Sequence, residues 1–237
     1  MYKIANQIKR ECINKVNQDD HTCSQLFISS MVAGAIIGLG CLTTLCLNSG
    51  ALVSGLIFPL ALALVAITQT DLFTGSNLIV YLGICDKSIS VSKGIQKWII
   101  IFLGNLCGSA LFVFLLSISG LMTPAGLSAA IEARQMITAT QLFCRGVLCN
   151  ILVCLAIALF AVYNRPIEKI IIAWLCILPF IVCGFEHSVA DMTILLLGLV
   201  NGVIYLPQAA LILLWVTLGN IVGGSLIVGN IVLYNSK

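Results

Sequence analysis

Three acidic residues and one histidine lie in stretches of the sequence that are otherwise apolar. They are Asp71, Glu186, Asp191 and His187. An ionised group at the centre of a bilayer costs between about 2.5 and 17 kcal/mol, depending on how far water and lipid relax around it. Acids in such stretches therefore need a structural or functional reason. His187 is the side chain there whose charge would change near neutral pH, so it is the first candidate for proton chemistry.

The composition places these residues in a membrane. Of the 237 residues, 60% are hydrophobic and 9% charged, whereas a soluble domain carries roughly 25% charged residues. Residues 21–70 and 192–236 contain no Asp, Glu, Lys or Arg, and each stretch is long enough for two crossings of about 20 residues. This excludes a water-soluble enzyme. The first apolar run is longer than the roughly 7–15 residues of a signal-peptide core, so we expect the mature chain to start at Met1.

Six apolar segments separate at turn residues and define the expected elements. They are residues 26–47, 51–82, 98–118, 142–163, 170–205 and 209–234. The second would be about 48 Å long as one helix, well beyond the roughly 30 Å hydrocarbon core. Polar strings interrupt the second and fifth segments: TDLFTG at 70–75 and GFEHS at 184–188. Irregular backbone cannot face lipid, so both breaks must line a protein-walled or watery cavity.

An internal repeat relates the two halves of the chain. A shift of 115 residues aligns LGNLCG (103–108) with LGNIVG (218–223) and places Asp71 on Glu186, and a shift of 116 aligns the starts of segments one and four. Three helices precede the repeat point and three follow it, so the halves must be inverted with respect to the membrane. We predict an all-α integral membrane fold with six transmembrane helices, as two inverted three-helix repeats of about 26–119 and 142–234. An arm of residues 1–25 precedes this channel domain of residues 26–235.

The positive charges predict the orientation. Ten of the twelve Lys and Arg residues fall in the N-terminal arm, in the two loops after segments two and four, and at the C-terminus. Loops rich in Lys and Arg stay in the cytoplasm, so both termini are expected there, in the cell membrane. The arm mixes isoleucines with charges and could form an amphipathic helix at the membrane surface.

Two roles are open for the acids at the breaks. A carboxylate beside a helix break can cap the second half-helix by accepting backbone N–H bonds. For Asp71 and Glu186 we favour this capping over direct contact with a substrate. A metal site needs at least three converging ligands, and His187 has only Cys183, Glu186 and Asp191 close in sequence. Neither a metal nor another cofactor is therefore expected.

Five motifs carry a family resemblance. They are DLFTGSN (71–77), FLGN (102–105), CNILVCLA (149–156), GFEHSVADM (184–192) and GNIVGG (219–224). In this order they resemble the formate/nitrite transporter family, whose members have an aquaporin-like architecture but lack the Asn-Pro-Ala signatures that are also missing here. The resemblance implies a homopentamer in the lipid bilayer, in which every protomer has its own pore for small monovalent anions of weak acids.

The resemblance also implies roles for pore residues. Leu72, Phe73 and Thr74 would form the cytoplasmic constriction and its hydrogen bonds. His187 would be the central histidine, and Asn150 would be a further polar group of the pore.

Charged residues at the two mouths follow from the same resemblance. Arg134 falls where the family usually has a lysine that draws anions into the outer vestibule. Lys15 is the nearest candidate for a cationic residue on the cytoplasmic side. The family usually has asparagine where this chain has Asp191, and an extra acid there would repel an anion unless it is paired or protonated.

These observations favour a channel or transporter for formate, nitrite, hydrosulfide or a similar anion such as acetate or lactate. An entirely apolar constriction would reject a charged anion on desolvation grounds. Either half-helix N-termini and His187 stabilise the anion, or it takes a proton and crosses as a neutral acid; we favour the second route. The alternatives are an aquaporin-type channel for neutral solutes and a membrane-embedded redox protein. No catalytic activity and no nucleic-acid partner is expected.

Overall fold

The computed structural model describes residues 2–17, 21–121 and 124–236, which form helices joined by turns and contain no strand. The helices are α1 (Tyr2–Asn17), α2 (Cys23–Leu47), α3 (Ala51–Ile57), α4 (Pro59–Thr68), α5 (Phe73–Cys85), α6 (Val91–Ser119), α7 (Leu127–Gln135), α8 (Ala139–Val162), α9 (Pro166–Val182), α10 (Ser188–Val200), α11 (Leu206–Ile221), a π-helical stretch η1 (Val222–Gly229) and α12 (Asn230–Asn235). Parts of the predicted arm, residues 1 and 18–20, and the final Lys237 lie outside the described residues.

The predicted spans are confirmed, including the two broken ones. Five stretches are long and apolar enough to cross a membrane: Cys23–Leu47, Ala51–Thr68, Val91–Ser119, Ala139–Val162 and Leu206–Asn235. The fifth predicted segment is divided into α9 and α10, neither of which has the 18 residues of such a span. Pro59 separates α3 from α4, because a proline has no N–H for the helical bond one turn back.

Both breaks begin with a residue in the left-handed conformation. Gln69 ends α4 at φ 57°, and Gly184 follows α9 at φ 68°. Gly184 lies 115 positions after Gln69, so the backbone leaves the two helices in the same way. In each case the next half-helix begins four residues later, at Phe73 and at Ser188.

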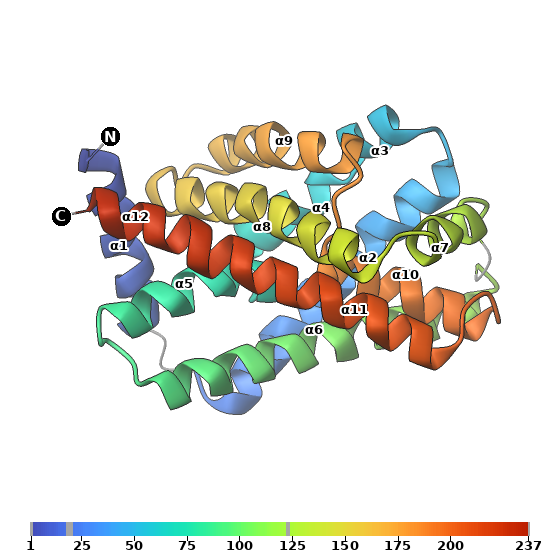
Figure 1. The fold of residues 1–237 in the computed structure, drawn as a ribbon, viewed down its shortest axis with the longest axis horizontal. Coiled ribbons are helices and arrows are strands. Elements are labelled where there is room, and N and C mark those ends of the chain that lie inside the picture. Colours follow the sequence, from blue (N-terminus) through green and yellow to red (C-terminus); the bar gives the residue numbers. More distant parts are fainter. Residues whose placement is uncertain (1, 18–20, 122–123, 237) are drawn as a thin grey trace.

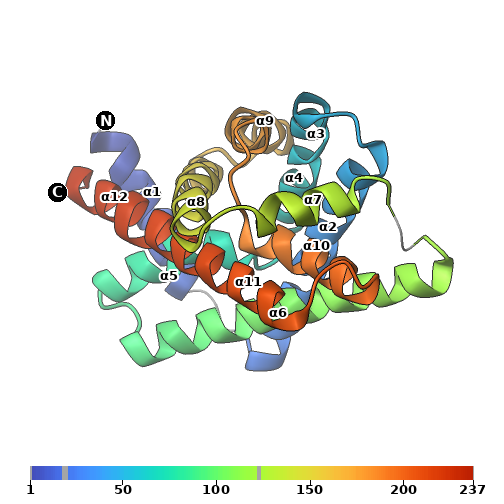
Figure 2. The same ribbon diagram turned by 45° about the vertical axis from the view of Figure 1, so that its right-hand side comes forward.

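The half-helices run in opposite directions from the centre of the molecule. Figure 1 shows both termini and α1 at one end and α7 at the other. α5 runs from the centre towards the α1 end, whereas α10 runs towards the α7 end. The extended segment between α9 and α10 is visible in Figure 2. These directions are those expected of inverted repeats.

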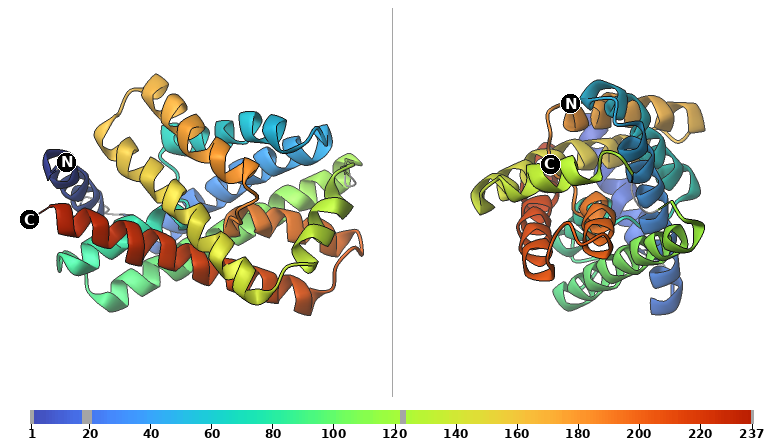
Figure 3. Two further views of the ribbon diagram at one scale, coloured as in Figure 1. Left: turned by 45° about the horizontal axis from the view of Figure 1, so that its top comes forward. Right: turned by 90° about the vertical axis from the view of Figure 1, so that its right-hand side faces the viewer.

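Helix pairs pack in the same way in each repeat. α2 packs against α6, and α8 packs against α11, which it crosses in the left view of Figure 3. Glycines permit this close approach: a Cβ on Gly108 would collide with the carbonyl of Met31, and one on Gly219 with that of Phe143. Small residues at such crossings are typical of membrane helices.

The helix α1 docks on the body formed by the apolar spans. Its buried residues Ala5, Ile8, Cys12 and Val16 recur every three or four positions, which is the spacing of one helical face. This face packs against α5, α8 and α12. The amphipathic helix predicted for the arm is present within residues 2–17, and it covers one end of the spans.

Candidate functional site

The N-termini of the two half-helices meet through one hydrogen bond between side chains. The hydroxyl Oγ1 of Thr74 lies 2.9 Å from Nε2 of His187. Thr74 is in the first turn of α5 and His187 is the N-cap of α10. Both side chains are buried, with exposed fractions of 0% and 4%. The positive ends of two helix dipoles therefore converge near this pair.

The hydrogen bonds of His187 define which ring nitrogen carries the proton. The backbone N–H of Ala190 donates to Nδ1 over 3.1 Å, so Nδ1 must accept and carries no proton. A neutral imidazole then has its proton on Nε2, and this N–H donates to Thr74 Oγ1. Ala190, His187 and Thr74 are thus joined by two hydrogen bonds, in which the imidazole accepts at Nδ1 and donates at Nε2.

Two asparagines from neighbouring helices cap the half-helices. Oδ1 of Asn105 in α6 accepts a 2.8 Å bond from the N–H of Phe73, and Oδ1 of Asn220 in α11 accepts a 2.8 Å bond from the N–H of Ser188. Their amide groups donate to carbonyls on the break itself, those of Asp71 and Glu186. Each asparagine thus satisfies donors and acceptors that a broken helix leaves open.

The capping role predicted for Asp71 and Glu186 is therefore wrong. The Asp71 carboxylate accepts a 2.7 Å bond from the Ser29 hydroxyl, which in turn accepts from the Asp71 N–H. The Glu186 carboxylate instead pairs with Arg134. In membrane breaks a side chain from the adjacent span can reach the half-helix N-terminus more directly than the flanking acid.

Apolar side chains flank the histidine. The ring of Phe180 in α9 stacks on the imidazole of His187 at 6.1 Å between centroids. Phe58, between α3 and α4, meets Phe180 edge to face at 5.9 Å. Leu72, the N-cap residue of α5, is 4% exposed and lines a cavity on the side of α1.

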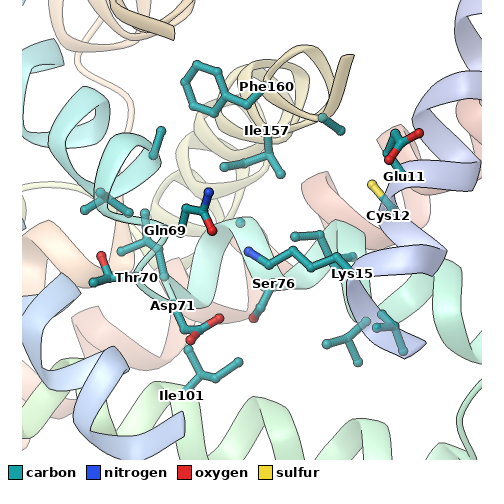
Figure 4. Close-up of a pocket in the computed structure, with 18 of the residues that line it drawn as sticks. Glu11, Cys12, Lys15, Gln69, Thr70, Asp71, Ser76, Ile101, Ile157 and Phe160 are labelled. Carbon is teal, nitrogen blue, oxygen red and sulfur yellow. The ribbon is translucent and has the colours of Figure 1, made fainter. Parts of the chain in front are cut away.

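A cavity of about 450 Å³ opens on the α1 side of this centre. Its wall includes Lys15 of α1, Lys169 of α9 and the break residues Asp71 and Leu72. Figure 4 shows the Lys15 side chain extending from α1 into the cavity. Lys169 Nζ donates a 2.9 Å bond to the carbonyl of Ala66 near the end of α4. With Lys97 of α6, three lysines thus line the cavity that also contains the second-segment break.

At the α7 end, Arg134 is held by two acids. Its Nε lies 2.9 Å from Oδ1 of Asp191, and its Nη2 lies 2.8 Å from Oε2 of Glu186. Nη1 donates a 2.9 Å bond to the carbonyl of Ala130. The structure brings these three predicted residues together, with the guanidinium engaged by carboxylates on two sides.

The remaining predicted residues have structural partners. The Asn150 amide donates to the carbonyls of Thr74 and Asn220 over 3.2 and 2.6 Å, so it ties the two repeats together. Phe73 packs its ring against Phe102 of α6 at 5.1 Å. Phe73 lines a separate apolar hollow beside Trp98 rather than the cavity at Leu72.

Four contributors to this centre carried no role in the sequence prediction: Asn105, Asn220, Phe58 and Phe180. The asparagines align in the 115-residue repeat, which was a usable signal. The phenylalanines lie in apolar runs like many others, and nothing in the pattern distinguishes them. Among the described residues no group of three or more His, Cys, Asp or Glu could hold a metal ion.

Comparisons with known proteins agree on one family. The family model described as "Formate/nitrite transporter" matches residues 2–234. The nitrite transporter NirC of Salmonella typhimurium is 38% identical over 219 residues, covering 86% of this chain and 80% of NirC. A solved structure described as an FNT family ion channel superposes with a TM-score of 0.84 at 33% identity, covering 99% of this chain and 98% of the other.

A second solved structure, described as a pentameric formate channel with formate bound, gives a TM-score of 0.76 at 26% identity, with 90% and 96% of the chains covered. The match of the family model, over residues 2–234, extends through both half-helix breaks and through α1. The chain belongs to the formate/nitrite transporter family.

Proposed function

We propose that the protein is a homopentameric channel or transporter for small monovalent anions of weak acids, such as formate, nitrite or hydrosulfide, and that each protomer has its own pore past His187. The observation that carries the proposal is the buried Thr74–His187 hydrogen bond between two half-helix N-termini. The names of the similar proteins, a nitrite transporter and a pentameric formate channel, support the anion and the pentamer.

The apolar flanks favour passage as a neutral acid. A bare anion between Phe180 and Leu72 would lose its hydration with little in return. Taking up a proton removes this cost, and the product is a small neutral acid that carries an O–H or S–H donor. Such a molecule can exchange hydrogen bonds with Thr74 Oγ1 and the Nε2–H of His187 in turn. Protons are therefore proposed as the second partner of transport.

The two mouths would collect anions by different means. Lys15 and Lys169 line the cavity on the α1 side. We place this side in the cytoplasm, because the arm, the two loops and the C-terminus predicted to be cytoplasmic hold ten of the twelve Lys and Arg residues. Arg134 would mark the outer mouth. Its pairing with two acids means that its charge is already compensated.

Uptake into proteoliposomes tests the proposal. Radiolabelled formate, nitrite, hydrosulfide, acetate and lactate would be compared at two pH values, with glycerol-induced swelling as the test for a neutral-solute channel. We expect uptake of at least one anion, faster at the lower pH, and no glycerol permeation. Glycerol permeation without anion uptake would instead support the aquaporin-type alternative.

The variant His187→Phe tests the central step. It keeps an aromatic ring against Phe180 but removes both ring nitrogens. We expect it to lower anion uptake at both pH values, because the passing acid loses the Nε2–H of His187 as a hydrogen-bond partner. If transport and its pH dependence were unchanged, the proposed passage past His187 would be wrong.

A further inference from the structure

The guanidinium of Arg134 is already occupied by groups that resemble the proposed substrate. Nε and Nη2 contact the carboxylates of Asp191 and Glu186, and Nη1 donates to a backbone carbonyl. The side chains of Arg134, Asp191 and Glu186 are 14%, 0% and 7% exposed, so Arg134 is the most exposed of the three. An anion that arrives at the α7 end meets these groups together.

The charges of the cluster do not leave Arg134 free to attract an anion. Two carboxylates face one guanidinium, so the cluster has no positive excess when both acids are ionised. A carboxylate and a guanidinium form charge-assisted hydrogen bonds that are stronger than neutral ones. A permeant formate would therefore have to compete with a carboxylate that is fixed in place.

Asp191 is the acid that hydrogen-bonds the guanidinium directly. Its Oδ1 accepts from Nε of Arg134, and its Oδ2 is buried without a hydrogen-bond partner among the described residues, as is Oε2 of Glu186. Asp191 also lies one turn after His187 on α10, with its N–H bonded to the His187 carbonyl over 2.9 Å. It thus connects the α7 end to the central histidine.

We propose that Asp191 is a tethered competitor for Arg134: its carboxylate occupies the guanidinium in the resting channel, and a permeant anion binds at the α7 end by displacing it. This rests on the proposed function. Asp191 then sets the apparent affinity for anions from this end only, and it acts as an affinity-determining residue through Arg134.

The variant Asp191→Asn isolates the charge. Its amide oxygen can still accept the bond from Nε of Arg134, so the packing is kept while the competing charge is lost. Initial uptake of radiolabelled formate would be measured against formate concentration in right-side-out and inside-out membrane vesicles. We expect the half-saturating concentration to fall about tenfold, equivalent to about 1.4 kcal/mol, in the one orientation that presents the α7 end, and to stay unchanged in the other.

Two controls define the mechanism. Asp86→Asn removes a carboxylate that pairs with Lys9 over 3.2 Å outside the site, and it should not change the half-saturating concentration. In an Arg134→Gln background, Asp191→Asn should have no further effect, because the guanidinium it competes for is gone. If Asp191→Asn fails to assemble, Asp191→Ser removes the same charge with a smaller side chain.

Several results would overturn this inference. They are an unchanged half-saturating concentration in Asp191→Asn, an equal fall in both vesicle orientations, or a fall that persists in the Arg134→Gln background. If the wild-type protein transported none of the anions, the proposed function itself would fail. If it transported them and Asp191→Asn behaved as wild type, only the tethered competitor would be wrong.

Discussion

The Thr74–His187 pair joins two side chains that are 113 positions apart and that both lie at the start of a half-helix. Because Nδ1 of His187 accepts from the Ala190 N–H, a second proton on the ring would oppose that donor and cost the bond. The imidazole therefore works best as a neutral donor through Nε2. This favours a proton that arrives with the anion over one stored on the histidine.

Removing the hydroxyl of Thr74 tests this reading. Thr74→Val keeps the size of the side chain but leaves the Nε2–H of His187 without its acceptor, which costs about 1–3 kcal/mol for a buried donor. We expect slower anion uptake in proteoliposomes, because the passing acid loses one of its two hydrogen-bonding partners. Thr74→Ser retains the hydroxyl and should keep most of the wild-type rate. Equal uptake by both variants would remove Thr74 from the pathway.

Single residues show where sequence reasoning succeeds. His187, Asp71 and Glu186 stood out because polar groups in an apolar stretch must have a reason. The contacts made around the breaks could not be predicted from the sequence in the same way. Arg134 bonds Asp191 across 57 positions, and Asn105 accepts from the Phe73 N–H across 32 positions. Such contacts depend on how helices cross, which the order of residues along one segment does not encode.

The half-helices depend on caps supplied by other helices. Asn105 and Asn220 are each fully buried, and each makes at least three hydrogen bonds to the breaks and to the crossing helix. Asn105→Leu and Asn220→Leu would leave the buried backbone N–H and carbonyl groups at the breaks without hydrogen-bond partners, which lowers the free energy of unfolding by about 1–3 kcal/mol for each group. We expect both variants to lower the midpoint of thermal unfolding in detergent.

The control for these caps is an asparagine at the surface. Asn235→Leu removes only an exposed bond to the Ile231 carbonyl, and surface changes of this kind usually stay within about 0.5 kcal/mol. A similar loss of stability in Asn235→Leu and in Asn105→Leu would contradict the capping role.

Substitutions at the two left-handed break residues should change stability in opposite directions. Gly184 has open space around a would-be Cβ, so Gly184→Ala carries only the backbone cost of a left-handed residue, about 1–2 kcal/mol. Gln69 already pays this cost at φ 57°, and Gln69→Gly should relieve it. We expect a lower unfolding midpoint for the first and a higher one for the second. Equal shifts in the same direction would refute the backbone explanation.

The sequence predicted most of the helices and both breaks. The excess length of residues 51–82 and 170–205, together with their polar strings, predicted both breaks, and the 115-residue repeat predicted that they correspond. The added division at Pro59 and the π-helical stretch η1 were not predicted. Hydropathy measures how much chain fits in lipid, and it does not resolve a kink inside a continuous apolar span.

At the scale of the whole molecule, glycines set how closely the repeats assemble. Gly108 and Gly219 let α6 and α11 approach the backbones of α2 and α8, and this brings Asn105 and Asn220 within reach of the breaks. Helix crossing, capping and the Thr74–His187 bond are therefore linked. The inverted repeat places equivalent breaks on opposite sides of one centre, but the two acids at the breaks have different partners. The Asp71 carboxylate accepts from the hydroxyl of Ser29, whereas the Glu186 carboxylate pairs with Arg134.

The orientation of this molecule in the membrane is testable with its own cysteines. Cys46 lies in the last turn of α2 towards the α7 end, and Cys85 ends α5 towards the α1 end; both are exposed. If the termini are cytoplasmic, a membrane-impermeant maleimide on intact cells should label Cys46, and Cys85 should react only after permeabilisation. Labelled peptides would be identified by mass spectrometry, and the reverse pattern would place the termini outside.

Cys12 supplies an internal control for the same experiment. Its side chain is buried where α1 docks, and this burial raises the pKa of the Cys12 thiol to about 12. The thiolate is the reactive form, so near neutral pH almost none is present, and its fraction grows only as the pH approaches that value. We expect Cys12 to stay unlabelled at neutral pH even in permeabilised cells that label Cys85. Labelling of both would mean that α1 leaves the channel body.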